Sequence, residues 1–140
     1  FCGYNMGEYF KHWLEIGKST DAAKLPKIFC VNWFRKSPEG KFMWPGFGDN
    51  SRVLKWVFER CDNGGQAVET AIGYMPTADA IDVTGLADVS CDTMKELLKV
   101  DVDGWKEELA MIKEHYAKFG DKLPKELAAQ LVKLEQRLNK

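Results

Sequence analysis

The chain has 140 residues, 45% of them hydrophobic, and a net charge of −1. That is enough for one folded domain with a real core, and no run approaches the ~18 apolar residues of a membrane span. Residue 1 is Phe rather than Met. We therefore expect a piece cut from a longer protein, whose removed part is free to carry a targeting peptide.

The first third of the chain reads as a helix followed by short extended segments. Residues 7–17 have helical spacing of apolar side chains, and residues 28–31 (Ile-Phe-Cys-Val) have the composition of a short buried strand. Residues 37–40 (Ser-Pro-Glu-Gly) are typical of a turn, so residues 41–44 are expected to return as a hairpin partner.

A second helix is predicted from about residue 50 to Cys61. The preceding Pro-Gly-Phe-Gly ends the hairpin, and Asp49, Asn50 or Ser51 is a suitable helix N-cap. The side chains expected to be buried are Val53, Leu54, Val57 and Phe58.

The second half reads as support for the first. Residues 67–75 are β-like, and three helices are predicted at about 91–99, 103–119 and 125–139. Two apolar stripes are expected to be core or docking faces: Trp105, Leu109, Ile112, Tyr116 and Phe119, and Leu127, Leu131, Leu134 and Leu138. The prediction is an α+β, helix-rich segment with a short β-hairpin, a loop leading into a helix, and a helical tail.

Charge is unevenly distributed. Residues 24–60 hold eight basic and three acidic side chains, a local charge of +5, whereas residues 61–140 hold ten basic and fifteen acidic ones, −5. The positive field of residues 24–60 favours an anionic ligand there. An ordinary basic surface exposed to solvent explains the charge distribution equally well.

The four cysteines lie roughly thirty residues apart, at Cys2, Cys30, Cys61 and Cys91. No CxxC pair or Cys/His cluster occurs, which argues against a zinc site, and reduced thiols are expected. No GxxxxGK[ST], HExxH or GxSxG motif occurs either. We therefore expect neither catalytic residues nor metal ligands in this chain.

The most informative stretch is residues 31–56, VNWFRKSPEGKFMWPGFGDNSRVLKW. Trp33, Phe34, Phe42 and Phe47 crowd around glycines and prolines, and Asn50 follows. Aromatic rings on a glycine-rich backbone suit a planar heterocycle, and a carboxamide can donate and accept along its edge. The stretch therefore points to a nucleotide base as ligand. Stacking does not depend on which base is bound, so hydrogen bonds to the edge of the base must select it.

Each of these residues also has an ordinary structural explanation. Asn50 is a suitable helix cap, and Phe34 and Phe42 can form a plain cross-strand pair. Trp33 and Trp44 are expected in the core or pocket wall, and Arg35, Lys36 and Arg52 can be surface charges.

The chain resembles the GTP-dependent phosphoenolpyruvate carboxykinases. The resemblance covers essentially all 140 residues, through FCGYNMGEYFKHWL, KLPKIFCVNWFRK, WPGFGDNSRVLKW and AIGYMPTADAIDVTGL. Asp49 stands where many relatives have Glu, and Cys30 where His or an aromatic is expected. Neither departure touches the stacking residues.

The resemblance implies which residues contact guanine. Phenylalanines matching Phe34 and Phe47 sandwich the base, the one matching Phe42 packs from the side, and the asparagine matching Asn50 hydrogen-bonds it. The predicted GTP-binding residues are Trp33, Phe34, Phe42, Phe47, Gly48, Asp49 and Asn50. We expect residues 1–65 to bind the base and residues 66–140 to support them, as one C-terminal nucleotide-binding segment.

The resemblance also implies the activity of the complete enzyme, which converts oxaloacetate and GTP to phosphoenolpyruvate, GDP and CO2 in gluconeogenesis. GTP or GDP, Mn2+ and the nucleotide's Mg2+ are its ligands, with the metal and substrate sites in the missing N-terminal part. Neither nucleic acid nor membrane is an expected partner. A monomeric, cytoplasmic enzyme is expected, with the mitochondrion as the alternative compartment.

Two other classes of function stay open. A single-stranded nucleic-acid module would use the aromatics and the +5 segment as a stacking platform and would bind with strong salt dependence. A helical interaction domain would use the leucine stripe of residues 127–138 and would associate without regard to GTP.

Overall fold

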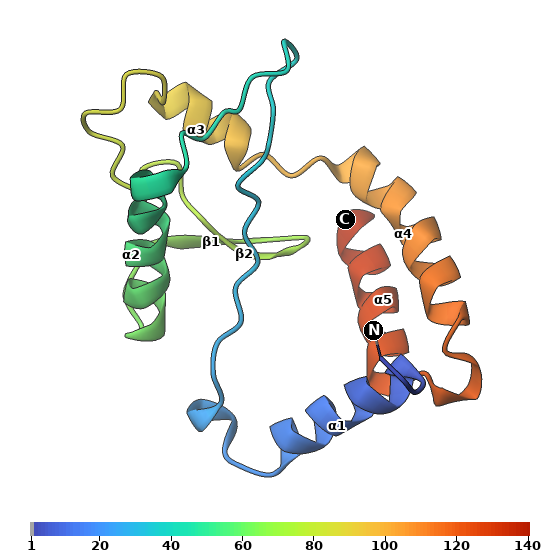
Figure 1. Cartoon of the computed structure of the whole chain (residues 1–140). Helices are drawn as coiled ribbons and strands as arrows, with labels where there is room; N and C mark the ends of the chain where they lie inside the picture. The colour runs from blue at the N-terminus through green and yellow to red at the C-terminus, as the bar shows by residue number, and fades with distance from the viewer. Residues whose placement is uncertain (1) are drawn as a thin grey trace. The chain divides into compact units, whose positions relative to one another are not determined.

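The computed structural model describes residues 2–140, which form two compact units. We call residues 1–26 and 101–140 the helical unit, and residues 27–100 the mixed unit. Across the described residues the structure has helices α1 to α5 and one two-stranded antiparallel sheet (Figure 1). The predicted α+β class is confirmed.

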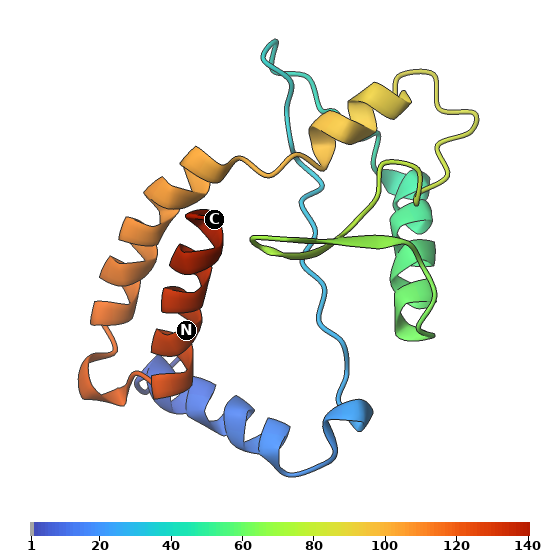
Figure 2. The ribbon, with the colours of Figure 1, turned by 180° about the vertical axis from the view of Figure 1, so that it is seen from behind.

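The helical unit contains α1 (Met6–Lys18), α4 (Val102–Ala117) and α5 (Lys125–Leu138), with short 3-10 turns at Ala22–Lys24 and Gly120–Lys122. Helices α4 and α5 lie side by side in both views (Figures 1 and 2). Their predicted stripes face inward, since Leu109, Phe119 and Leu138 are buried and the other members of both stripes are half-buried.

Helix α1 is attached to this unit by its capping residue and one aromatic contact. The side chain of Asn5 accepts from the Gly7 amide at 2.8 Å and donates to the Phe119 carbonyl at 3.2 Å. The Phe10 ring meets the Phe119 ring edge-on, with centroids 5.9 Å apart. Two ion pairs add to these contacts, Glu8–Lys122 at 2.8 Å and Lys18–Glu126 at 2.6 Å.

The mixed unit contains α2 (Asn50–Cys61), the hairpin of β1 (Ala67–Thr70) and β2 (Gly73–Pro76), and α3 (Cys91–Leu97). A 3-10 turn at Phe47–Asp49 leads directly into α2. The strands pair in register from Ala67 opposite Pro76 to Thr70 opposite Gly73. The core of the unit consists of Trp44, Trp56, Ile81, Val89 and Met94.

Two expectations about this unit were wrong in part. Residues 28–31 form no strand, and Ile28 is 76% exposed, because no second segment among residues 2–140 pairs with that backbone. The prediction that residues 67–75 are β-like is confirmed, since they belong to the hairpin of β1 and β2. Leu54 and Phe58 are exposed on α2. The face of the helix that carries Trp56 packs into the core, so the face that carries Leu54 and Phe58 points to solvent.

The boundary between the compact units does not coincide with the expected division at residue 65. That division separates expected roles rather than packed units, so it stays a prediction. No helix in the described part of the chain is both long and apolar enough to cross a membrane.

Candidate functional site

A tight turn brings Phe34 and Phe42 together. The Ser37 amide donates to the Lys41 carbonyl at 2.8 Å, and the Met43 amide donates to the Arg35 carbonyl at 3.0 Å. Lys36 and Phe42 form an isolated antiparallel bridge, so the predicted hairpin exists, in its shortest form. The Phe34 and Phe42 rings meet edge-on with centroids 6.2 Å apart, and they are 71% and 59% exposed.

Hydrogen bonds of Asn32 and Arg35 hold this hairpin in place. The Asn32 side chain accepts from the Phe34 amide at 3.0 Å, forming an Asx turn after which Trp33 packs against the core and Phe34 faces solvent. Arg35 donates to the Leu97 carbonyl at 2.8 Å and to Glu96 at 3.0 Å, at the C-terminal end of α3 where a cation is favoured. Arg35 is therefore an anchor rather than a free surface charge.

Loop 46–49 presents Phe47 on an unusual backbone. Gly46 has φ 77° and ψ −161°, a region that only glycine enters readily. Phe47 follows with φ 50°, a left-handed conformation uncommon for a bulky residue, and its side chain is 99% exposed. No ring among residues 2–140 pairs with it. The loop thus holds an aromatic ring in solvent at a cost in backbone strain.

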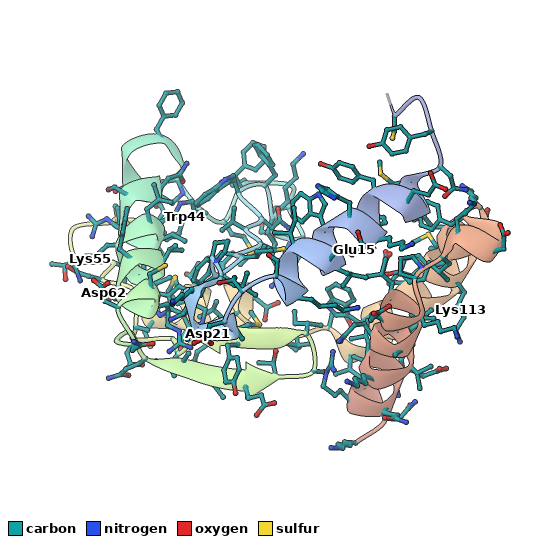
Figure 3. The ribbon with its side chains drawn as sticks, turned by 90° about the horizontal axis from the view of Figure 1, so that it is seen from below. Glu15, Asp21, Trp44, Lys55, Asp62 and Lys113 are labelled. Atoms are coloured by element: carbon teal, nitrogen blue, oxygen red, sulfur yellow. The ribbon has the colours of Figure 1, made fainter. Side chains whose placement is uncertain are left out.

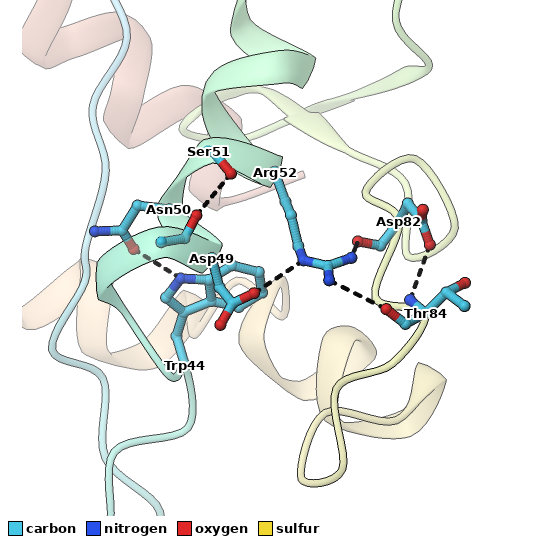
Figure 4. Close-up of polar contacts among 8 residues, drawn as sticks. Trp44, Asp49, Asn50, Ser51, Arg52, Asp82 and Thr84 are labelled. Atoms are coloured by element: carbon cyan, nitrogen blue, oxygen red, sulfur yellow. Dashed lines mark hydrogen bonds and ion pairs between the residues drawn. The ribbon is translucent and has the colours of Figure 1, made fainter.

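Asn50 is bonded to the core rather than capping its helix. Its Oδ1 accepts from Nε1 of Trp44 at 2.9 Å (Figure 4). Helix α2 has no side-chain cap, and Ser51 Oγ instead donates to the Gly48 carbonyl at 2.6 Å. The N-cap explanation of Asn50 is therefore wrong, and its carboxamide is set by Trp44, which lies beside α2 (Figure 3).

Arg52 ties the loop to a second loop at residues 82–84. Its Nε donates to Asp49 Oδ1 at 3.1 Å, and its two terminal nitrogens donate to the carbonyls of Asp82 at 2.8 Å and Thr84 at 3.1 Å (Figure 4). Hydrogen bonds from the Thr84 side chain and amide lower the pKa of Asp82, whose Oδ1 accepts from that amide at 2.8 Å. Arg52 is a structural crosslink rather than a solvated charge.

Six of the seven predicted site residues thus fall into three pairs. Phe34 and Phe42 touch each other, Phe47 and Gly48 occupy the exposed loop, and Asp49 and Asn50 bond to Arg52 and Trp44. Trp33 is half-buried against the core. The expected core position of Trp44 is confirmed, but its bond to Asn50 and the crosslink made by Arg52 were not predicted. The Asp49/Arg52 spacing of three residues was an available signal for the second.

The arrangement offers aromatic faces and hydrogen-bonding groups, which suit binding. Among residues 2–140, no group of three His, Cys, Asp or Glu side chains is placed to hold a metal ion. The four cysteines are free and exposed. Lys36 adds positive charge beside the rings, with Nζ 5.2 Å from the centroid of Phe42.

Comparison with known proteins gives consistent matches. Residues 1–137 match the family described as the phosphoenolpyruvate carboxykinase C-terminal P-loop domain. Proteins named phosphoenolpyruvate carboxykinase [GTP] are 57% identical in Treponema pallidum (strain Nichols), 53% in Neocallimastix frontalis and 48% in Arthrobacter sp. (strain FB24). Each alignment covers 99% of this chain and 22% of the relative. The chain, which spans about a fifth of these relatives' length, belongs to the GTP-dependent phosphoenolpyruvate carboxykinase family.

Proposed function

We propose that this chain is the guanine-binding part of an enzyme that converts oxaloacetate and GTP to phosphoenolpyruvate, GDP and CO2. The observation that carries the proposal is Phe47, fully exposed on a left-handed backbone. Exposing a phenylalanine and straining its backbone both oppose folding, so a ligand that stacks on the ring accounts for the arrangement better than packing does.

The rings supply affinity and the polar groups supply selection. Phe34 and Phe47 stack on the two faces of guanine, and Phe42 packs from the side, each stacked base being worth about 1–3 kcal/mol. Asn50 hydrogen-bonds the edge of the base. Gly48 lets the base approach the backbone, since no atom beyond the adjoining backbone and side chains of its own turn lies within 4 Å of the position its Cβ would occupy.

The remaining two predicted residues act indirectly. Trp33 forms the wall behind Phe34, because it is half-buried against the core. Asp49 holds the loop in place through its ion pair with Arg52, at 3.1 Å. Neither needs to touch the nucleotide to affect its binding.

The rest of the reaction belongs to the upstream part of the parent protein. We assign to it the phosphate-binding loop, the ligands of Mn2+ and of the nucleotide's Mg2+, and the oxaloacetate site. Positioning dominates phosphoryl transfer, so a base site remote from the reacting atoms still affects turnover. Apolar side chains exposed in the helical unit, Tyr9, Trp13 and Ile16, fit a face that this upstream part covers. We propose a monomeric, cytoplasmic enzyme.

The test is oxaloacetate-dependent formation of phosphoenolpyruvate by the full-length protein, with GTP and with ATP. We expect activity with GTP and little with ATP. Activity with ATP alone would keep the reaction and overturn the base site, and activity with neither would overturn the proposed function. Phe47→Ala and Asn50→Ala then test the loop: both are expected to raise the KM for GTP, and unchanged kinetics in both would remove the loop from the site.

A further inference from the structure

We infer that Trp44 determines the guanine preference of the site by holding the Asn50 carboxamide in one of its two orientations. This inference rests on the proposed function, in which Asn50 reads the edge of the base. Trp44 itself need not touch the nucleotide, so it is a positioning residue.

The orientation follows from the chemistry of the two groups. An indole Nε1–H can only donate, whereas a carboxamide has one oxygen that accepts and one nitrogen that donates. The oxygen of Asn50 must therefore face Trp44, and Oδ1 of Asn50 does accept from Nε1 of Trp44 at 2.9 Å. Figure 4 shows the amide nitrogen of Asn50 on the side away from the indole. The group left for a ligand is a donor.

Burial of Trp44 makes this orientation hard to reverse. The side chain is 6% exposed and belongs to the core cluster with Trp56, so its ring cannot turn to follow the amide. A flipped Asn50 would set two donors against each other and leave the indole unpaired. An unpaired buried donor disfavours that state by about 5- to 150-fold.

A fixed donor distinguishes guanine from adenine at position 6. Guanine carries an acceptor there, O6, and adenine carries an amino donor. The outward Nδ2 of Asn50 bonds O6 and is repelled by the adenine amino group. Inosine has the same O6, so ITP is expected to behave like GTP. The selectivity of the loop would thus be set by a core tryptophan six residues away from the asparagine that reads the base.

The chain provides a matched control in Trp56. This residue is also 6% exposed, lies in the same core cluster, and donates from Nε1 at 2.9 Å, to the Gln66 carbonyl instead of a base-reading side chain. Trp44→Phe and Trp56→Phe each remove one indole and one buried hydrogen bond. Both variants therefore lose stability, but only the first frees Asn50.

The experiment measures kcat/KM for GTP, ITP and ATP in the full-length protein and both variants. We expect Trp44→Phe to lower the GTP/ATP and ITP/ATP ratios by about tenfold, because the amide can then turn its oxygen toward adenine. Trp56→Phe is expected to keep both ratios. An unchanged GTP/ATP ratio in a folded Trp44→Phe variant would overturn the inference. A wild-type protein without GTP preference would overturn the proposed function first, and the inference with it.

A second variant keeps the inference open to refutation if Trp44→Phe does not fold, because the inference requires that Asn50 donate to the base. In Asn50→Asp one oxygen still accepts from Trp44, and the other presents an acceptor to the base. If the wild-type contact is a donor to O6, this variant loses its preference for GTP and ITP over ATP. If Asn50 instead accepts from the guanine N–H groups, the carboxylate keeps or strengthens GTP use, and the inference is wrong.

Discussion

Nε of Arg52 lies 3.1 Å from Oδ1 of Asp49, and the same guanidinium holds the carbonyls of Asp82 and Thr84. One side chain thus joins the loop that carries Phe47 to a segment thirty residues away. Only a planar group with several donors can make all these bonds at once, which is why lysine is a poor substitute.

We therefore predict that Arg52→Lys raises the KM for GTP by about three- to tenfold with a smaller effect on kcat, because it loosens the loop rather than the reacting groups. Steady-state kinetics of the full-length protein measure this. The control is Lys55→Gln on the same helix. The Lys55 side chain is exposed and projects outward, and its ion pair among residues 2–140 is with Glu59 (Figure 3). Equal effects of the two substitutions would refute a special role for Arg52.

Phe47→Gly is predicted to separate stability from binding. Glycine relieves the strain at φ 50° but adds backbone entropy to the unfolded chain, so the free energy of unfolding changes by less than about 1 kcal/mol. Loss of the ring weakens GTP binding by about 1–3 kcal/mol. Denaturant unfolding and nucleotide titration of the full-length protein measure the two quantities.

The comparison variant for Phe47 is Phe119→Ala. Phe119 is 6% exposed, and its truncation is expected to cost about 3–5 kcal/mol of stability. A comparable loss of stability in Phe47→Gly would mean that the ring packs within the protein, and that its exposure has nothing to do with a ligand.

Gly46→Ala is predicted to lower the stability of the protein, and Gly48→Ala is predicted to lower its affinity for GTP. Both positions have open space around the missing Cβ, so packing does not distinguish them. Gly46 has φ 77°, and alanine there costs about 1–3 kcal/mol of stability, whereas Gly48 has no such φ. We expect Gly48→Ala to leave the melting temperature unchanged and to raise the Kd for GTP at least about fivefold, since its methyl occupies the approach to the backbone. Wild-type GTP affinity in Gly48→Ala would take Gly48 out of the site.

Acid is predicted to loosen α1 within the helical unit. Hydrogen bonds from Lys122 and Lys18 lower the pKa values of Glu8 and Glu126 respectively. Because the folded-state pKa values lie below the usual 4.5, these pairs stabilise the fold above that pH and lose their contribution as pH falls through the lowered values. Both carboxylates are solvent-exposed, so the effect is small.

Hydrogen exchange of the amides of residues 6–18 measures this effect in the full-length protein. Wild type is expected to protect these amides better than a Glu8→Gln, Glu126→Gln variant at pH 7, and the difference is expected to shrink as the pH falls below the usual carboxyl pKa of 4.5 and through the lowered values. Glu15→Gln is the control, since the nearest lysine nitrogen lies 3.9 Å from that carboxylate, along the same helix. A difference that persists unchanged in acid would contradict the assignment to these two pairs.

Local patterns in the sequence were sufficient for most helices. The prediction of 7–17 corresponds to α1 at Met6–Lys18, and that of residue 50 to Cys61 corresponds to α2. Helical periodicity and end signals lie within the segment itself, so they can be read without knowing the partners. The 37–40 turn was predicted for the same reason, and its Gly40 has φ 82°.

Predictions that depended on distant partners were less successful. Residues 28–31 have the composition of a strand but no pairing segment in the described chain, and a strand is defined by its partner. On α2 the apolar residues outnumber the positions that the core can cover. Trp56 lies on the buried face of the helix and Phe58 is 71% exposed. Helical periodicity alone does not predict which of the two is buried.

The sequence by itself determined the family, the order of the helices and the residue types available to the proposed base site. Those follow from local spacing and from a motif contiguous along the chain. Only the tertiary structure decided that Asn50 faces Trp44 instead of capping its helix, and that Arg52 reaches residues 82–84. Such contacts depend on where a rigid core places each donor, and a hydrogen bond tolerates errors of only a few tenths of an ångström.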